Sequence, residues 1–148
     1  MCATKGFTLL ELLAAIAIVG VLATLGYGSY QSNIEKSNFR TMQEFGVELA
    51  LHQQLHRQRF GRYALTVAST GAPAASRLVM PSVTKYQVNV SSADFRGYTA
   101  EVRKHDRSPQ KLPMACAVLI VESAVGIQRF GTQSATGQNT SEQCVPHG

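Results

Sequence analysis

The feature that most constrains this chain is an almost uncharged stretch near its start, FTLLELLAAIAIVGVLATLGY at residues 7–27, whose single charged residue is Glu11. An α-helix rises about 1.5 Å per residue, so about 20 apolar residues cross a bilayer core of about 30 Å. The stretch is therefore long enough for a membrane-spanning helix. A cleaved secretory signal does not fit, because the apolar core of such a signal is only about 7–15 residues long and small residues at a cleavage site follow it.

Glu11 is unusual in such surroundings. A carboxylate within an apolar helix costs about 2.5–3.5 kcal/mol on membrane-insertion scales, which indicates that it has a partner. One interpretation pairs it with a cation. The other places it at the membrane interface near the helix N-terminus, where the helix dipole favours negative charge.

The string KGFTLLELL, in which Gly6 precedes Phe7 and Glu11 follows four residues later, resembles the leader and N-terminus of type IV pilins and type II secretion pseudopilins. The resemblance is specific over residues 1–36 and looser beyond them. It implies that a membrane-bound prepilin peptidase cuts after Gly6 and N-methylates Phe7. It also implies that Glu11 pairs with the new α-amino group, which is mostly charged at neutral pH, in its own chain or in the neighbouring subunit.

This resemblance divides the chain into a leader (1–6), a transmembrane and assembly helix (7–28) and an extracytoplasmic head domain (29–148). The head is long enough for one small domain with its own core. Gly26 and Gly28 weaken a helix by about 1 kcal/mol each, which predicts a bend or a locally melted turn there. Many pilins have proline where this chain has Gly28.

The helical pattern resumes after the glycines and ends near Arg59, with Gly61 as its predicted C-cap. Two apolar stripes lie on it, one formed by Ile34, Met42, Phe45 and Leu49, the other by Val47, Leu51 and Leu55. Two stripes indicate either two packing partners, a sheet and a neighbouring helix, or one broad buried face.

Alternation with a period of two predicts half-buried antiparallel strands, and it follows an irregular loop at 66–84. The predicted strands are 85–92, 97–104, 115–123 and 126–131, with the third in the middle of the sheet; residues 132–148 are predicted to form a surface loop. The predicted fold class is α+β, with a long N-terminal helix packed on a four-stranded antiparallel sheet.

Cys2 lies in the predicted leader, which leaves Cys116 and Cys144 in the head domain. An even pair of cysteines in an oxidising compartment predicts a disulfide, which would stabilise the fold by about 3–4 kcal/mol in the chain-entropy model. Two free buried thiols are the alternative. The pilin resemblance favours the disulfide, because pilins commonly close their C-terminal loop in this way.

The sequence contains no catalytic motif, so no enzymatic activity, cofactor or metal is predicted. His52 and His56 are spaced to share a metal ion on one helix face, but no third ligand is evident. Solvated histidines are the favoured interpretation.

The head carries the whole net charge of +5. Arg57, Arg59 and Arg62 flank Phe60, and a second basic cluster includes Arg103 and Lys104. Cations mixed with an aromatic ring suit nucleic acid, so these residues are candidate DNA contacts. The alternative is favourable charge at a helix C-terminus and on a solvated loop.

The sequence therefore predicts a major or minor type IV pilus subunit that serves motility, adhesion or DNA uptake. Its precursor would be a single-pass inner-membrane protein with a periplasmic head, and its later location the pilus at the cell surface. The predicted partners are other pilin subunits, the prepilin peptidase, the inner-membrane assembly platform and DNA. The alternatives are a type II secretion pseudopilin and a DNA-binding minor pilin of natural transformation.

Overall fold

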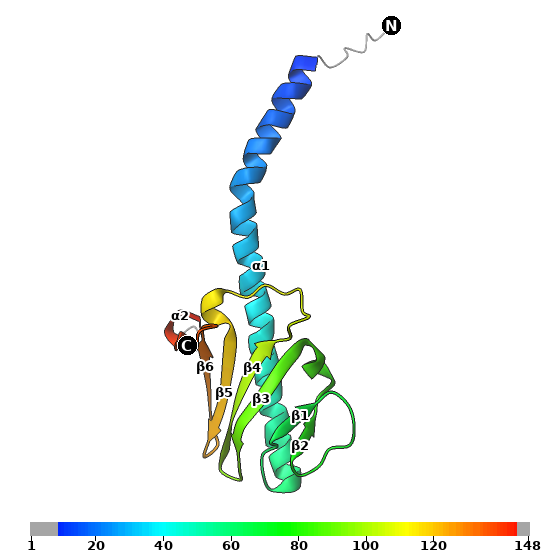
Figure 1. Ribbon diagram of the computed structural model, residues 1–148, viewed down its shortest axis with the longest axis vertical. Coiled ribbons are helices and arrows are strands. Elements are labelled where there is room, and N and C mark those ends of the chain that lie inside the picture. Colours follow the sequence, from blue (N-terminus) through cyan, green and yellow to red (C-terminus); the bar gives the residue numbers. More distant parts are fainter. Residues whose placement is uncertain (1–8, 145–148) are drawn as a thin grey trace. The chain divides into compact units, whose positions relative to one another are not determined.

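The computed structural model describes residues 9–144 (Figure 1). The predicted leader, the cleavage position at Gly6 and the methylation position at Phe7 lie outside the described residues. The chain divides into two compact units, one ending at Ile34 and the other beginning at Glu35. In chain order the main elements are α1 (Leu9–Phe60), β1 (Thr66–Ala68), β2 (Arg77–Val79), β3 (Tyr86–Ala93), β4 (Gly97–Lys104), β5 (Val118–Ala124), β6 (Ile127–Gln133) and α2 (Ser141–Cys144).

The first unit contributes the apolar half of α1. The most apolar 18 residues of this helix have a mean hydropathy of 2.4, and none of them is buried. By length and composition, α1 is the one helix within residues 9–144 that is able to cross a membrane. The helix continues without interruption through residues 26 and 28, so the locally melted turn predicted there is wrong. One reason is that helical glycine costs only about 1 kcal/mol, too little to interrupt a long apolar helix by itself.

In the second unit, α1 covers one face of a four-stranded sheet (Figure 1). Met42, Phe45 and Leu49 of the first predicted stripe are buried in the core, and the ring centroid of Phe45 lies 4.7 Å from that of Tyr86 on β3. Ile34, also assigned to this stripe, is 39% exposed. The second stripe does not share the buried face, because Val47, Leu51 and Leu55 are all at least half exposed. The alternative of one broad buried face is therefore wrong.

The sheet order is β3-β4-β5-β6, with every neighbouring pair antiparallel. Alternate residues of β4 and β5 point into the core, namely Tyr98, Ala100, Val102, Leu119 and Val121. This confirms the four predicted strands and the central position of β5. Two corrections are needed. Residues 115 and 116, predicted as strand, belong to a 3-10 turn at Met114–Cys116. The prediction of a surface loop over 132–148 is also wrong in part, because β6 extends to Gln133, Thr132 and Thr140 are buried, and Ser141–Cys144 form α2.

The segment after α1 begins at Gly61, whose N–H donates to the carbonyl of Arg57 in the left-handed conformation expected of a C-cap (φ 75°). The loop predicted at 66–84 contains two three-residue strands, β1 and β2, which pair in parallel. A 3-10 helix, Pro81–Lys85, then leads into β3.

The C-terminal segment is fastened to the sheet in two ways. A disulfide joins Cys116 to Cys144, as predicted. In addition, the N–H of Thr132 on β6 donates to Ser141 Oγ at 3.0 Å, and the N–H of Thr140 donates to the Thr132 carbonyl at 2.9 Å. This segment therefore covers the outer edge of β6 at Thr132.

Candidate functional site

The first candidate site is the apolar surface of α1. Glu11 lies in the first turn of the helix and is exposed, and the residues around it are apolar and exposed as well. Such a surface is unfavourable in water, because burying one leucine side chain stabilises a protein by about 1.5–3 kcal/mol relative to leaving it exposed. The length and composition of the helix fit an inner-membrane anchor and an assembly surface.

The same helix also exposes apolar side chains in the second unit. Val47, Leu51 and Leu55 recur every four residues and are 57%, 59% and 50% exposed. Side chains four apart lie on one side of a helix, so the three form a single stripe, which we call the outer stripe. Exposed apolar residues in a row indicate an interaction surface more strongly than isolated ones do.

The second candidate site is basic and lies where α1 ends. Arg57 and Arg59 are in its last turn. The guanidinium of Arg57 lies 5.3 Å from the ring centroid of Tyr63, and that of Arg59 lies 5.3 Å from the ring of Phe60. These distances are within the range of cation–π attraction.

The structure adds two residues that sequence reasoning missed. Arg96 and Phe95 lie on the turn between β3 and β4, and the Arg96 guanidinium is 5.2 Å from the centroid of the Phe95 ring. Both residues line one cavity together with Arg57. The hairpin itself was predictable from the two alternating strands, but nothing in the pattern placed its tip beside the end of α1.

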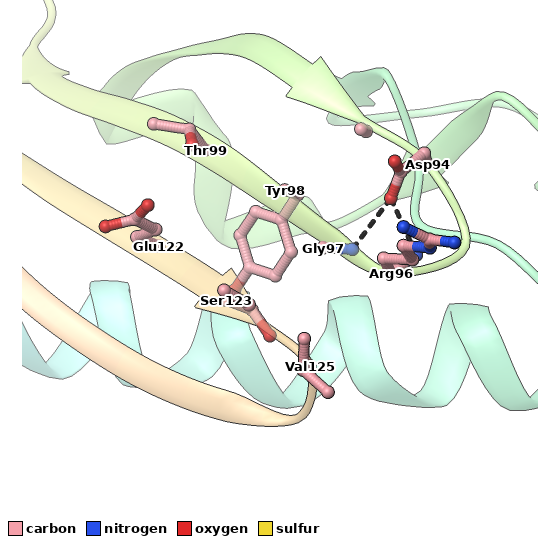
Figure 2. A pocket seen from close by; sticks show the side chains of 10 residues that line it. Asp94, Arg96, Gly97, Tyr98, Thr99, Glu122, Ser123 and Val125 are labelled. Atoms are coloured by element: carbon pink, nitrogen blue, oxygen red, sulfur yellow. Dashed lines mark hydrogen bonds between the residues drawn. The ribbon is translucent and has the colours of Figure 1, made fainter.

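Asp94 fixes this turn. Its Oδ1 accepts hydrogen bonds from the backbone N–H groups of Arg96 at 2.6 Å and Gly97 at 2.8 Å (Figure 2). These two bonds lower the pKa of the Asp94 carboxyl, with further lowering by the charges of Arg96 and Arg62. Arg62 directly precedes Tyr63, whose N–H donates to the Asp94 carbonyl at 3.0 Å, so its backbone lies next to this turn.

Arg103 and Lys104, the other candidate DNA contacts, are not brought to this end. They are at the far end of β4 from Gly97, where Lys104 pairs with Tyr86 of β3. Seven residues of strand span about 23 Å. Arg103 lies 3.2 Å from the carboxylate of Glu101, and Lys104 Nζ donates to the carbonyl of Ser108 at 3.3 Å. The two basic clusters therefore form separate surfaces.

The histidines have different environments. His56 is buried, and its Nδ1 and Nε2 atoms lie 3.0 and 2.8 Å from the carbonyl oxygens of Arg62 and Ala74. The interpretation of His56 as solvated is therefore wrong, because its ring ties two later segments to the helix. His52 is partly exposed, with Nε2 3.9 Å from Glu48. Within residues 9–144 no group of three or more His, Cys, Asp or Glu side chains is arranged to hold a metal ion.

Comparison with known proteins finds similarity in the N-terminal part of the chain, which includes the apolar half of α1. Residues 1–27 match the family model of the prokaryotic N-terminal methylation motif. Over 37 residues the chain is 54% identical to fimbrial protein Q and to a type IV major alpha-pilin, both of Moraxella bovis. These matches cover 25% of this chain and 24% and 23% of the two relatives, so the chain spans about a quarter of their length. No solved structure matches the chain. The N-terminal region of this chain therefore carries the methylation motif and is similar to the matching region of these two proteins.

Proposed function

We propose that this chain is a pilin-like subunit that is cut after Gly6, methylated at Phe7 and assembled through α1 into an extracytoplasmic filament. The observation that carries the proposal is the exposed apolar half of α1, which has Glu11 as its charged residue and begins within the methylation motif. In this proposal the prepilin peptidase and an inner-membrane assembly platform act on the precursor. The work of the mature subunit is structural.

Assembly would transfer the apolar helix from lipid to a bundle of identical helices. Lipid tails are as apolar as leucine, so this transfer gains little from the hydrophobic effect. Close packing and polar contacts between helices must then supply the stabilisation. A pair between Glu11 and the α-amino group of a neighbouring Phe7 would supply one such contact and would also set the register of the helices, a well-attested use of a buried ion pair.

The outer stripe supports the same proposal outside the membrane. Val47, Leu51 and Leu55 face away from the core that Met42, Phe45 and Leu49 enter. A helix of a neighbouring subunit would cover these three side chains, so the bundle would extend into the second unit of each subunit.

Replacement of Gly6 and Glu11 in the cell tests this proposal. Gly6→Ala is expected to leave an unprocessed chain, and Glu11→Ala a processed chain that does not enter filaments. Mass spectrometry of the mature chain, together with filament counts by electron microscopy, measures both effects. Glu122→Ala, which removes an exposed carboxylate from β5, is the matched control and should assemble normally.

Two results would contradict the proposal. One is a mature chain that still begins at Met1 and carries no N-terminal methyl group. The other is a normal number of filaments in the Glu11→Ala strain.

A further inference from the structure

A loop rich in basic residues lies at the end of the sheet where α1 enters the second unit (Figure 1). It follows the last residue of β4, Lys104, and runs through residues 105–113 to Met114. The Nδ2 of Asn38 donates to the carbonyl of Lys111 at 2.9 Å. Because the second unit begins at Glu35, this bond ties the loop to the first turn of α1 in that unit.

The loop is held in shape by its own contacts. The N–H of Ser108 donates to the His105 carbonyl at 2.8 Å, and Lys104 Nζ donates to the Ser108 carbonyl at 3.3 Å. Leu112 packs against the hydrophobic core. The N–H of His105 also donates to the Lys85 carbonyl at 3.3 Å, which places Lys85 beside the loop. The basic side chains are therefore presented from an ordered surface.

Positive charge predominates at this end of the second unit. Four cations lie on the loop or directly beside it, and two more lie on α1 within two residues of Asn38. We call these six residues the basic collar: Lys36, Arg40, Lys85, Lys104, Arg107 and Lys111. Carboxylates of the same segments, those of Glu35, Glu44 and Asp106, offset part of this charge.

The loop adds an exposed apolar side chain to these cations, and its sequence contains no aromatic residue. Met114 is 88% exposed, and residues 105–114 read HDRSPQKLPM. Surfaces that bind single-stranded nucleic acid combine cations with aromatic rings on which the bases stack, so nucleic acid suits this loop poorly. Cations beside an exposed apolar side chain suit the surface of an anionic bilayer, which offers phosphate groups next to an apolar interior.

The chain also keeps this end near the expected membrane boundary. Tyr27 and Tyr30, where the apolar half of α1 ends, are 63% and 65% exposed, and tyrosines gather at membrane–water interfaces. Asn38 follows Tyr30 by eight residues of one continuous helix, which corresponds to about 12 Å along its axis. Long basic side chains next to Asn38 therefore start close to the headgroups.

We propose that the basic collar and Met114 bind the anionic phospholipids of the bilayer in which α1 is anchored. The cations contact headgroup phosphates, and the Met114 side chain enters the interface between headgroups and acyl chains. This contact holds the second unit against the bilayer before the subunit enters a filament. The proposal rests on the proposed function in one respect, since it requires that α1 spans a membrane.

Hydrogen–deuterium exchange of residues 105–114, in the full-length chain reconstituted in vesicles, tests the proposal. Vesicles of phosphatidylcholine with about 30 mol% phosphatidylglycerol should slow this exchange at least about twofold relative to phosphatidylcholine alone. About 0.5 M salt should remove the difference, because it screens the charges. Exchange of residues 94–97, at the other end of β4, should be equal in the two kinds of vesicle.

Substitutions then identify the side chains responsible. Each cation near an anionic surface strengthens binding about fivefold. Lys85→Gln combined with Arg107→Gln, both at exposed positions, should therefore weaken the contact about 25-fold and abolish the slower exchange. Met114→Ser should reduce the slowing as well, since it removes the apolar group. The matched control is Arg96→Gln, at an exposed arginine of the β3–β4 turn, which should leave the slowing unchanged.

Three results would overturn the proposal. The first is equal exchange of residues 105–114 in both kinds of vesicle. The second is an equal effect of Arg96→Gln and of the double variant, which would indicate general attraction to a basic protein. The third is the same protection from a short DNA duplex added to the chain in phosphatidylcholine vesicles, which would assign the surface to polyanions in general.

Flotation of the vesicles separates this proposal from the proposed function. A chain that does not float with the vesicles contradicts the membrane anchor on which both proposals depend. A chain that floats and exchanges equally in both kinds of vesicle contradicts the lipid contact alone.

Discussion

Gly46 of α1 lies so close to Leu119 of β5 that a Cβ atom added to the glycine would be 2.5 Å from Leu119 Cδ2. Leu119 is fully buried in the hydrophobic core, so it has little room to move away from such an atom. We therefore expect Gly46→Ala to destabilise the head domain by about 1–3 kcal/mol, since added volume forces neighbouring side chains from their packed positions. Chemical denaturation followed by circular dichroism measures the loss.

The control for this prediction is Gly28→Ala, at a helical glycine where no atom lies within 4 Å of the added Cβ. It should not lower the stability of the head. Leu119→Val in the Gly46→Ala background should recover part of the loss, and a purely additive effect of the two changes would contradict the predicted contact.

Gln53 is fully buried, although glutamine is usually a surface residue. Its Nε2 donates to the Ala64 carbonyl at 3.1 Å, and its Oε1 accepts from the Ala64 N–H at 2.8 Å. Gln53→Leu would leave both backbone groups of Ala64 buried without a partner, and should cost about 2–3 kcal/mol in unfolding free energy. The exposed Gln58→Leu is the matched control, and an equal effect of both substitutions would contradict the prediction.

The bond between Cys116 and Cys144 closes a loop of 28 residues. Replacing both cysteines with serine should lower the unfolding free energy by about 3–4 kcal/mol in the chain-entropy model. A shift of the denaturation midpoint measures this loss, and reduction of the unaltered protein with dithiothreitol should reproduce it. An unchanged midpoint after confirmed reduction would show that the other contacts of this segment suffice.

Tyr98 is buried, and within residues 9–144 its hydroxyl has no hydrogen-bond partner. Burial raises the pKa of this hydroxyl, and the neighbouring Tyr63 raises it further. Because a buried hydroxyl without a partner is unfavourable, Tyr98→Phe should stabilise the head by about 1 kcal/mol at neutral pH.

The matched variant is Tyr63→Phe. The Tyr63 hydroxyl accepts a hydrogen bond from Arg57 and lies 3.3 Å from Ser123 Oγ, so its removal should destabilise the head instead. A loss of stability in both variants, measured by urea denaturation at the same pH, would mean that the Tyr98 hydroxyl is satisfied in solution.

The β3–β4 turn should weaken in acid. The backbone hydrogen bonds from Gly97 and Arg96 hold the pKa of Asp94 below its ordinary value of 3.8. A carboxyl whose pKa is lowered by folding stabilises the protein above its unfolded pKa, and that contribution is lost as the pH falls through the folded pKa. We therefore expect the loss to occur below about pH 4.

Asp94→Asn isolates this effect, because the asparagine carbonyl still accepts hydrogen bonds but does not titrate in this range. The stability difference between the unaltered protein and Asp94→Asn should be constant from pH 7 to pH 5 and should shrink below about pH 4. A difference that stays constant down to pH 2 would contradict the assigned role of the carboxylate.

Much of the fold was predictable, because its elements carry strong periodic patterns. Tyr98, Ala100 and Val102 alternate with polar residues on β4, and this pattern requires no knowledge of the rest of the chain. The parallel pairing of β1 and β2 has no such basis. It joins residues about ten positions apart, such as Val67 and Leu78, and depends on how the loop packs.

A candidate site was predictable only where its residues are close together in the sequence. The string around Glu11 is continuous, whereas Arg57 and Arg96 share a cavity only after the whole sheet has formed. The burial of Gln53 and His56 was also not predictable from the sequence. The sequence favoured a solvated His56 and gave no signal for Gln53, but both side chains are buried, because they contact backbone groups of segments that follow the helix.

The hydrogen bonds between Thr132 and residues 140 and 141 affect how closely packed copies of the head domain would interact. An open strand edge is a template on which another chain can add a strand, and this hazard grows when many copies are held close together. Here residues 140 and 141 occupy the edge of β6 at Thr132, and the Cys116–Cys144 disulfide holds this C-terminal segment in place. A head domain without the disulfide would expose more of the unpaired edge of β6 to neighbouring copies. Reducing conditions would therefore favour aggregation through strand pairing.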